Sequence, residues 1–187
     1  MSFDAVVLVG GDARRLGGVD KATIEVGGLS LLDRALAAVH EASEIIVVGP
    51  RHPTSEPVRW TSESPAGGGP LRATLAGLEH VTNDVVVVLA VDYPFVSPEI
   101  IAELIRAAGS RDGAALQDAS GFMHYVVGAY RTNVLNAAID ARPPSDASMR
   151  SLFEPLDIAA VRAGQAALDI DTPEDFERAR TSAPDDD

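Results

Sequence analysis

Lysine occurs once in this 187-residue chain, at Lys21, whereas arginine occurs 14 times. Lys21 ends a segment, Gly10–Lys21, that reads GGDARRLGGVDK and contains four glycines. Glycine lets a backbone turn tightly and bring its N–H groups close to an anion, and lysine adds a compact charge on a flexible stem. This combination favours contact with phosphate oxygens in a crowded loop. The alternative is chance, since a single lysine must fall somewhere.

The glycine-rich segment matches neither of the two commonest nucleotide-binding motifs. A P-loop needs Gly-Lys-Ser/Thr after its strand, but Lys21 follows Asp20 and precedes Ala22. The spacing Gly-x-Gly-x-x-Gly of dinucleotide-binding proteins is also missing from the segment. A phosphate site here would therefore belong to another class of protein, with Arg14 and Arg15 adding positive charge near Lys21.

A second chemical candidate is Asp92, which directly follows the most apolar segment of the chain, Val85–Val91. Ligands of open α/β sheets bind beyond the carboxyl ends of the strands, so a carboxylate in this place is well positioned to hold Mg²⁺ through one oxygen. Pro94, two residues later, ends regular structure. An aspartate that only caps the loop is equally compatible with the sequence.

Two other segments combine polar or small residues with helix-start signals. Ser62–Leu78 has three glycines and a proline ahead of a helical pattern, whose N-terminus can face an anion or a base. Asp169–Phe176 reads DIDTPEDF and would place Asp169 and Asp171 on the same face of an extended segment. A flexible loop accounts nearly as well for the first segment, and helix capping accounts for Asp171 and Thr172 in the second.

The elements that must position these residues alternate between apolar runs typical of buried strands and amphipathic helical patterns. This order predicts right-handed crossovers and one three-layer α/β domain over residues 1–187, with a mostly parallel sheet. We expect residues 182–187 to form a frayed acidic tail. The expected strands are Phe3–Val9, Glu44–Val48, Val85–Val91, Gly113–Leu116, Met123–Tyr130 and Asp157–Ala163; the expected helices are Ser30–Ala42, Pro70–His80, Ser97–Ala108, Thr132–Ala141, Met149–Phe153 and one that opens at Pro173.

Composition excludes several classes of function. The net charge of −13 argues against nucleic-acid binding, and no apolar run has the length of a membrane span. The chain has no cysteine and its start, MSFD, lacks the features of a signal peptide, so we expect a cytoplasmic protein without thiol chemistry. The four histidines show no metal-ligand spacing, and no Gly-x-Ser-x-Gly motif supports a hydrolase triad.

Taken together and in this order, the four segments resemble the MobA family, the molybdenum cofactor guanylyltransferases of the nucleotidyltransferase superfamily. LVGGDARRLGGVDKA at Leu8–Ala22 is similar to that family's Leu-Ala-Gly-Gly…Arg-Met-Gly-Gly-x-Asp-Lys signature. GGPLRATLAGL, AVDYPFV and DIDTPEDF are similar to its Gly-Pro-Leu-Ala-Gly, Cys-Asp-x-Pro and Asn-x-Asn-Thr-Pro-Glu-Asp segments. The resemblance spans nearly the whole chain and implies a Rossmann-like layered α/β nucleotidyltransferase fold.

The resemblance also implies roles for individual residues. Lys21, Arg15 and Asp92 would be catalytic, with Asp92 holding Mg²⁺. The nucleotide would contact Leu8, Val9, Gly10 and Gly11 together with Lys21, Glu63 and Asp92. The pterin substrate would contact Asp169, Asp171 and Thr172.

The reaction that the resemblance implies is transfer of GMP from GTP to molybdopterin with release of diphosphate. Partners would be these two small molecules, with transient contacts to proteins that donate molybdopterin and to molybdoenzymes that receive the product. Two departures, Pro50 and Glu63, stand where the family often has asparagine and aspartate, and Asp169 and Asp171 replace asparagines. Two alternatives stay open: a nucleotidyltransferase that uses CTP or another phosphorylated acceptor, and a nucleotide-binding module without turnover.

Overall fold

The computed structural model describes residues 2–10, 19–64, 67–141 and 148–182. Residues 11–18 of the glycine-rich segment, among them Gly11, Arg14 and Arg15, lie outside this part, as does the chain beyond Ser182. Ser182 is the last residue of a helix, and the rest of the predicted tail, residues 183–187, lies outside the described residues.

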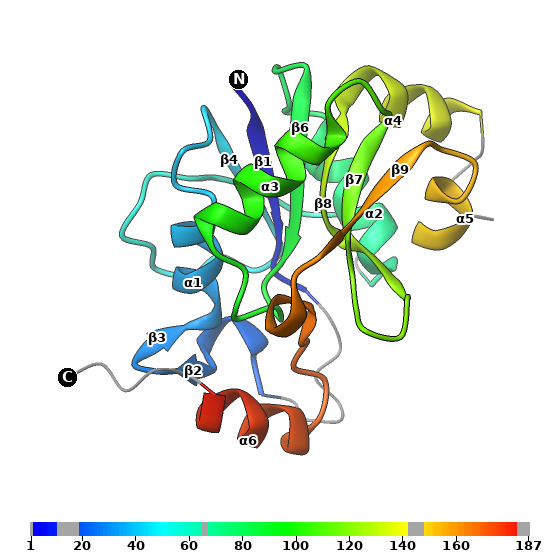
Figure 1. Cartoon of the computed structure of the whole chain (residues 1–187). Coiled ribbons are helices and arrows are strands. Elements are labelled where there is room, and N and C mark those ends of the chain that lie inside the picture. The colour runs from blue at the N-terminus through cyan, green and yellow to red at the C-terminus, as the bar shows by residue number, and fades with distance from the viewer. Residues whose placement is uncertain (1, 11–18, 65–66, 142–147, 183–187) are drawn as a thin grey trace.

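A seven-stranded sheet in the order β5-β4-β1-β6-β8-β7-β9 forms the centre of the molecule (Figure 1). Neighbours among β5, β4, β1 and β6 are parallel, as are β7 and β9, whereas β8 runs antiparallel to β6 and β7. The predicted mostly parallel sheet is confirmed, but the sequence pattern predicted neither β5 nor the direction of β8. The strands are β1 (Asp4–Leu8), β4 (Ile45–Val48), β5 (Arg59–Thr61), β6 (Val85–Ala90), β7 (Gly113–Gln117), β8 (Met123–Arg131) and β9 (Ile158–Arg162).

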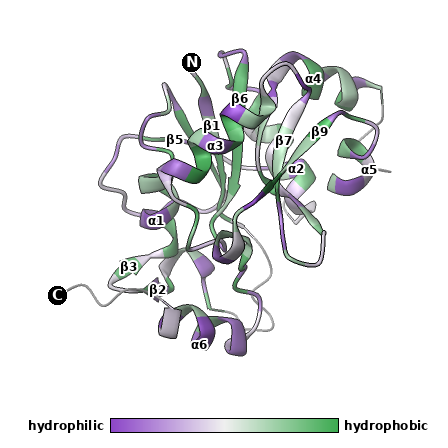
Figure 2. Cartoon of the chain, viewed as in Figure 1, coloured by the Kyte–Doolittle hydropathy of each residue, from purple (hydrophilic) through white to green (hydrophobic). Residues whose placement is uncertain are grey.

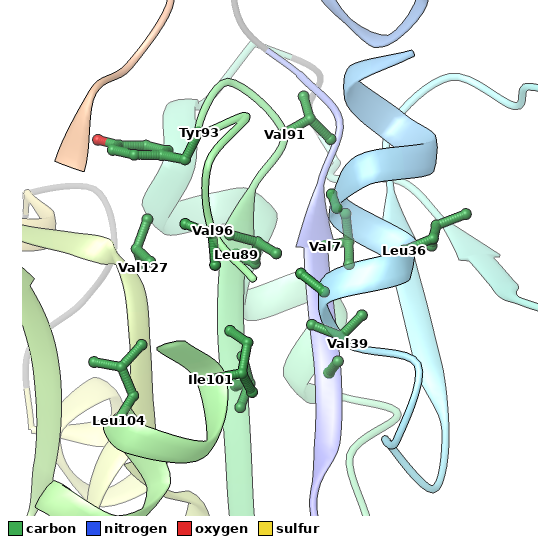
Figure 3. Close-up of a cluster of buried hydrophobic side chains, with 14 of the residues drawn as sticks. Val7, Leu36, Val39, Leu89, Val91, Tyr93, Val96, Ile101, Leu104 and Val127 are labelled. Atoms are coloured by element: carbon green, nitrogen blue, oxygen red, sulfur yellow. The ribbon is translucent and has the colours of Figure 1, made fainter. Parts of the chain in front are cut away.

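Helices cover both faces of this sheet, which gives the three predicted layers. α1 (Leu31–Ala38) and α3 (Pro98–Ala108) pack on one face, and α2 (Gly69–Leu78), α4 (Thr132–Asp140) and α5 (Met149–Phe153) pack on the other. Alternate residues of one strand serve the two layers: Val7 packs with α1 and α3, whereas Val6 and Leu8 pack with α2. Figure 2 shows the resulting hydrophobic centre, and Figure 3 shows Val7 beside helix α1 and Ile101 of α3 beneath Leu89 and Val96.

Helix α2 lies unusually close to the sheet because Gly77 has no side chain. A Cβ at Gly77 would lie 2.3 Å from Cγ1 of Val6 and 3.2 Å from Cγ2 of Val48. This close approach holds α2, whose preceding loop carries part of the predicted site, against the sheet.

The remaining elements are short and lie outside the sheet. They are the 3₁₀ turn η2 (Lys21–Thr23), the hairpin strands β2 (Glu25–Val26) and β3 (Leu29–Ser30), the 3₁₀ turn η3 (Gly164–Ala167) and the C-terminal helix α6 (Pro173–Ser182). Among the described helices none is long and apolar enough to cross a membrane.

The carboxyl ends of β1, β4 and β6 meet at one edge of the sheet, where Leu8 pairs with Val48 on one side and with Ala90 on the other. After β1 the chain continues to β4 on one side of β1, and after β6 it continues to β7 and β8 on the other side. The loops that follow β1 and β6 therefore border the point at which the strand order reverses, where sheets of this type bind ligands.

Candidate active site

Lys21 and Asp92, which the sequence analysis expected to meet above the sheet, are in direct contact. The Nζ of Lys21 donates a hydrogen bond to Oδ2 of Asp92 at 3.0 Å. Lys21 opens η2, and the side chain of Asp20 caps this turn. The loop that carries Asp92 is fixed to β1 because the N–H of Val91 donates to the carbonyl of Leu8 at 3.2 Å. The two side chains therefore lie within reach of one nucleotide.

A second carboxylate, Asp171, also binds the ammonium group of Lys21. The Nζ of Lys21 donates to Oδ1 of Asp171 at 2.6 Å. The segment that carries Asp171 is a loop rather than a strand, and the N–H of Ile170 anchors it to the carbonyl of Asp92 at 2.9 Å. The side chains of Lys21, Asp92 and Asp171 are 10%, 20% and 49% exposed, so the ammonium is buried between one shielded and one exposed carboxylate.

The charges of this cluster change the pKa of its members. Burial lowers the pKa of Lys21, but the charges and hydrogen bonds of Asp92 and Asp171 outweigh burial, so the pKa ends above its ordinary value. Burial raises the pKa of Asp92; the opposing effect of Lys21 is smaller, and the charges of Asp171 and Asp169 raise the pKa further. The surroundings of Asp92 therefore disfavour its ionised form, and a second cation beside this carboxylate would stabilise that form.

One oxygen of Asp92 lacks a hydrogen-bond partner among the described residues. Oδ2 contacts Lys21, but Oδ1 is buried and has no hydrogen-bond partner in the described part of the chain. A carboxylate oxygen is a ligand that Mg²⁺ prefers, and Mg²⁺ in nucleotide sites is held by one or two carboxylates together with substrate phosphates and water. Within the described residues no group of three or more His, Cys, Asp or Glu side chains could hold a metal. The residues therefore fit an ion shared with the substrate rather than one enclosed by protein.

The end of β1 carries the backbone expected to contact the nucleotide. Leu8 and Val9 are buried, and the N–H of Val9 donates to the carbonyl of Val48 at 2.8 Å, whereas Gly10 is exposed. Gly49, which the sequence analysis missed, makes this arrangement possible. It has φ +142°, and a Cβ there would lie 1.8 Å from the carbonyl oxygen of Val9. The sequence feature that could have indicated Gly49 is its position directly after the apolar run Ile45–Val48.

Glu63 organises the loop before α2. Its Oε1 accepts hydrogen bonds from the N–H groups of Gly67 at 2.7 Å and Gly68 at 3.2 Å. None of its hydrogen bonds goes to Lys21 or Asp92. Its other oxygen, Oε2, is buried and has no hydrogen-bond partner among the described residues. Glu63 therefore fixes the start of α2 and keeps one acceptor for a further donor.

The last predicted segment divides between two roles. Thr172 and Asp175 cap α6 reciprocally: Thr172 Oγ1 donates to Asp175 Oδ2 at 2.7 Å, and Asp175 N–H donates to Thr172 Oγ1 at 3.2 Å. The capping alternative is therefore correct for Thr172. It is wrong for Asp171, whose carboxylate binds Lys21. Asp169 acts on Asp92 through its charge.

Comparison with known proteins agrees with this geometry. Residues 5–162 match the family model of the MobA-like NTP transferase domain. The chain belongs to this family. It is 30% identical to a probable molybdenum cofactor guanylyltransferase of Natronomonas pharaonis, over 94% of this chain and 95% of the relative. It is 33% identical to one of Mycobacterium avium, over 84% of this chain and 83% of the relative.

Solved structures of low sequence identity share the fold. Molybdopterin-guanine dinucleotide biosynthesis protein A of Archaeoglobus fulgidus has a TM-score of 0.72 and 21% identity, over 95% of this chain and 97% of its own. The 2-C-methyl-D-erythritol 4-phosphate cytidylyltransferase of Thermus thermophilus has a TM-score of 0.75 and 20% identity, over 97% and 98%. Because one fold serves a protein of each kind, the fold alone does not choose the base or the acceptor.

Proposed function

We propose that this chain is a molybdenum cofactor guanylyltransferase, which transfers GMP from GTP to the terminal phosphate of molybdopterin and releases diphosphate. The observation that carries the proposal is the contact between Lys21 and Asp92 at the reversal point of a MobA-like sheet. The names of full-length relatives supply the base and the acceptor. Molybdopterin-donating proteins and acceptor molybdoenzymes are its proposed transient partners.

The chemistry suits a site without a general base. An oxygen of the acceptor phosphate, already ionised, forms a bond to the α-phosphorus of GTP, and the bond from that phosphorus to the bridging oxygen breaks. The electron pair leaves with diphosphate, so no proton needs to be removed. Catalysis is then alignment of two anions and neutralisation of their charge. Lys21 supplies a buried cation for this purpose, and Arg15 would supply a second.

Asp92 would hold Mg²⁺ through its unpartnered Oδ1. Mg²⁺, when bound, neutralises charge on the phosphate oxygens. The backbone at Leu8, Val9, Gly10 and Gly11 would contact the nucleotide together with Glu63. Asp169, Asp171 and Thr172 would face the molybdopterin substrate.

The test is release of diphosphate from GTP in the presence of molybdopterin and Mg²⁺, with the dinucleotide product identified by mass spectrometry. Parallel reactions with CTP and ATP separate the proposal from the cytidylyltransferase alternative, because the fold shared with the Thermus neighbour leaves the base open. We expect GTP to be the preferred substrate. Preference for CTP would replace the base assignment, and binding of GTP without diphosphate release would favour the non-catalytic alternative.

A further inference from the structure

A pocket of about 740 Å³ lies between the start of α2, the loop that joins β7 to β8, and the start of α5. This volume is typical of a site for a small molecule. Tyr93, the residue directly after Asp92, forms part of its wall, as does Pro70 at the start of α2. The pocket therefore adjoins the carboxylate on which the proposed function depends.

Three aromatic rings form a row along this wall. The ring of His124 makes edge-to-face contacts with Tyr93 at 5.6 Å and with Phe122 at 5.0 Å between centroids. The hydroxyl of Tyr93 and Nδ1 of His124 are 2.9 Å apart and share a hydrogen bond. Tyr93 and His124 are buried, whereas Phe122 is 55% exposed. The row leads from solvent to the residue beside Asp92.

The β7–β8 loop holds Phe122 in a fixed place. Oδ1 of Asp118 accepts hydrogen bonds from the N–H of Phe122 at 2.9 Å and from the N–H of Ser120 at 2.8 Å. Gly121, with φ +89°, completes the turn. The backbone that carries the ring is therefore ordered before a ligand arrives, which lowers the cost of ordering it on binding.

His124 also lines the pocket, and one of its ring nitrogens is only weakly partnered. The residue is 9% exposed, and its Nε2 has no hydrogen-bond partner in the part of the chain that the structure describes. Oδ2 of Asp118 lies 3.5 Å from this nitrogen, which is longer than a well-formed hydrogen bond. Nε2 thus has a long contact to one carboxylate, which helps to lower the pKa of Asp118, and a ligand atom at ordinary hydrogen-bond distance would satisfy this nitrogen better.

From these observations we infer that the pocket binds the ring system of the acceptor, a planar nitrogen heterocycle of the pterin class. The ring stacks on Phe122 and bonds to Nε2 of His124, with its phosphate directed toward Asp92. The inference rests on the proposed function for the identity of the acceptor and makes Phe122 and His124 specificity-determining residues. Asp169, Asp171 and Thr172, which the resemblance assigned to the pterin, do not line the pocket.

The first test compares Phe122→Ala with Leu29→Ala, a change of another exposed apolar side chain on strand β3, outside the pocket. A fluorescent phosphorylated pterin is titrated into each protein without GTP, and GTP with Mg²⁺ is titrated separately by calorimetry. Loss of one stacking ring should weaken pterin binding about tenfold. We expect the GTP affinity of Phe122→Ala to stay unchanged and Leu29→Ala to bind both ligands as the unchanged protein does.

The second test separates the two nitrogens of His124. Asparagine can replace Nδ1 and keep the bond to Tyr93, whereas glutamine can place its amide near Nε2. His124→Asn should therefore weaken pterin binding, and His124→Gln should retain more of it. If both His124 variants and Phe122→Ala bind the pterin as tightly as the unchanged protein does, the inference is overturned.

The GTP titrations decide which ring occupies the pocket. A guanine base has the same chemistry as a pterin, so weaker GTP binding by Phe122→Ala with unchanged pterin binding would also overturn the inference. Failure of the proposed function gives a different result: the unchanged protein would bind the pterin through Phe122 but release no diphosphate from GTP and molybdopterin. If the unchanged protein turns over GTP and molybdopterin but Phe122→Ala binds the pterin equally well, the inference about the pocket is refuted and the proposed function is not.

Discussion

Replacing Lys21 tests the proposed chemistry most directly. Lys21→Ala removes a cation whose Nζ lies 3.0 Å from Asp92 and 2.6 Å from Asp171, and leaves a buried carboxylate without its ion pair. Loss of one preorganised donor at a site of developing charge costs about 3–4 kcal/mol in the barrier. This corresponds to a fall in kcat/KM of about 10²- to 10³-fold. The pKa of Asp92, already raised by burial, should rise further.

Lys21→Arg keeps the charge and changes its shape. The side chain of Lys21 is only 10% exposed, and its ammonium lies between two carboxylates. The larger planar guanidinium of arginine must therefore displace Asp171 or the η2 turn. We expect a loss of at least about tenfold in kcat/KM, smaller than that of Lys21→Ala. Arg106→Lys in the last turn of α3 is the reciprocal control and should leave turnover unchanged.

The assay is initial-rate diphosphate release over a range of GTP concentrations at saturating molybdopterin, with thermal unfolding recorded for each variant to show that it is folded. If Lys21→Ala keeps more than a third of the kcat/KM of the unchanged protein, the electrostatic role is refuted. If Lys21→Arg is fully active, the site needs a positive charge but not the shape of lysine. The steric explanation for the single lysine would then be wrong, even if Lys21→Ala is inactive.

Three further predictions follow from other contacts. Asp171→Asn removes a negative charge that is 49% exposed and competes for Lys21, so the KM for GTP should fall about threefold at saturating molybdopterin; a rise in this KM would contradict the prediction. Gly49→Ala places a Cβ 1.8 Å from the carbonyl oxygen of Val9, and it should weaken GTP binding and cost about 3 kcal/mol in urea unfolding, whereas Gly164→Ala, with a positive φ but open space, should leave GTP binding unchanged. Asp4 is fully buried and accepts four hydrogen bonds from Thr82 and Asn83; burial alone would raise its pKa, but these bonds lower it below 3.8. The stability that ionised Asp4 contributes is present above pH 4 and is lost as pH falls through its lowered pKa, so Asp4→Asn should cost about 2 kcal/mol at pH 7 and less at pH 3; an equal cost at both pH values would refute this account.

Much of the fold could be predicted because the central strands are buried on both faces. Apolar runs such as Val85–Val91 stand out for that reason. The strand Arg59–Thr61 was missed because it lies at the edge of the sheet and is half exposed. The direction of β8 was predictable but was not predicted: too few residues separate Gly113–Gln117 from Met123–Arg131 for a crossover, so the two strands must be antiparallel.

The candidate site was predictable where strand ends determine it. Lys21 and Asp92 meet because they follow neighbouring parallel strands, and this requires only the order of the elements. The contact of Asp171 with Lys21 spans 150 residues and depends on one loop hydrogen bond, from Ile170 to Asp92, that no local pattern encodes. The row of aromatic rings could not be predicted for a similar reason: Phe122 and Tyr93 belong to separate loops, and no local sequence pattern shows that they meet at His124.

The two carboxylates that hold Lys21 differ in burial, and this difference decides which one a triphosphate displaces. Displacing Asp171 returns an exposed carboxylate to water, which solvates it readily. Displacing Asp92 would leave a buried charge without its cation, a change that costs far more. A phosphate should therefore replace Asp171 while Lys21 stays on Asp92, so that the ammonium and the carboxylate remain together on the same nucleotide.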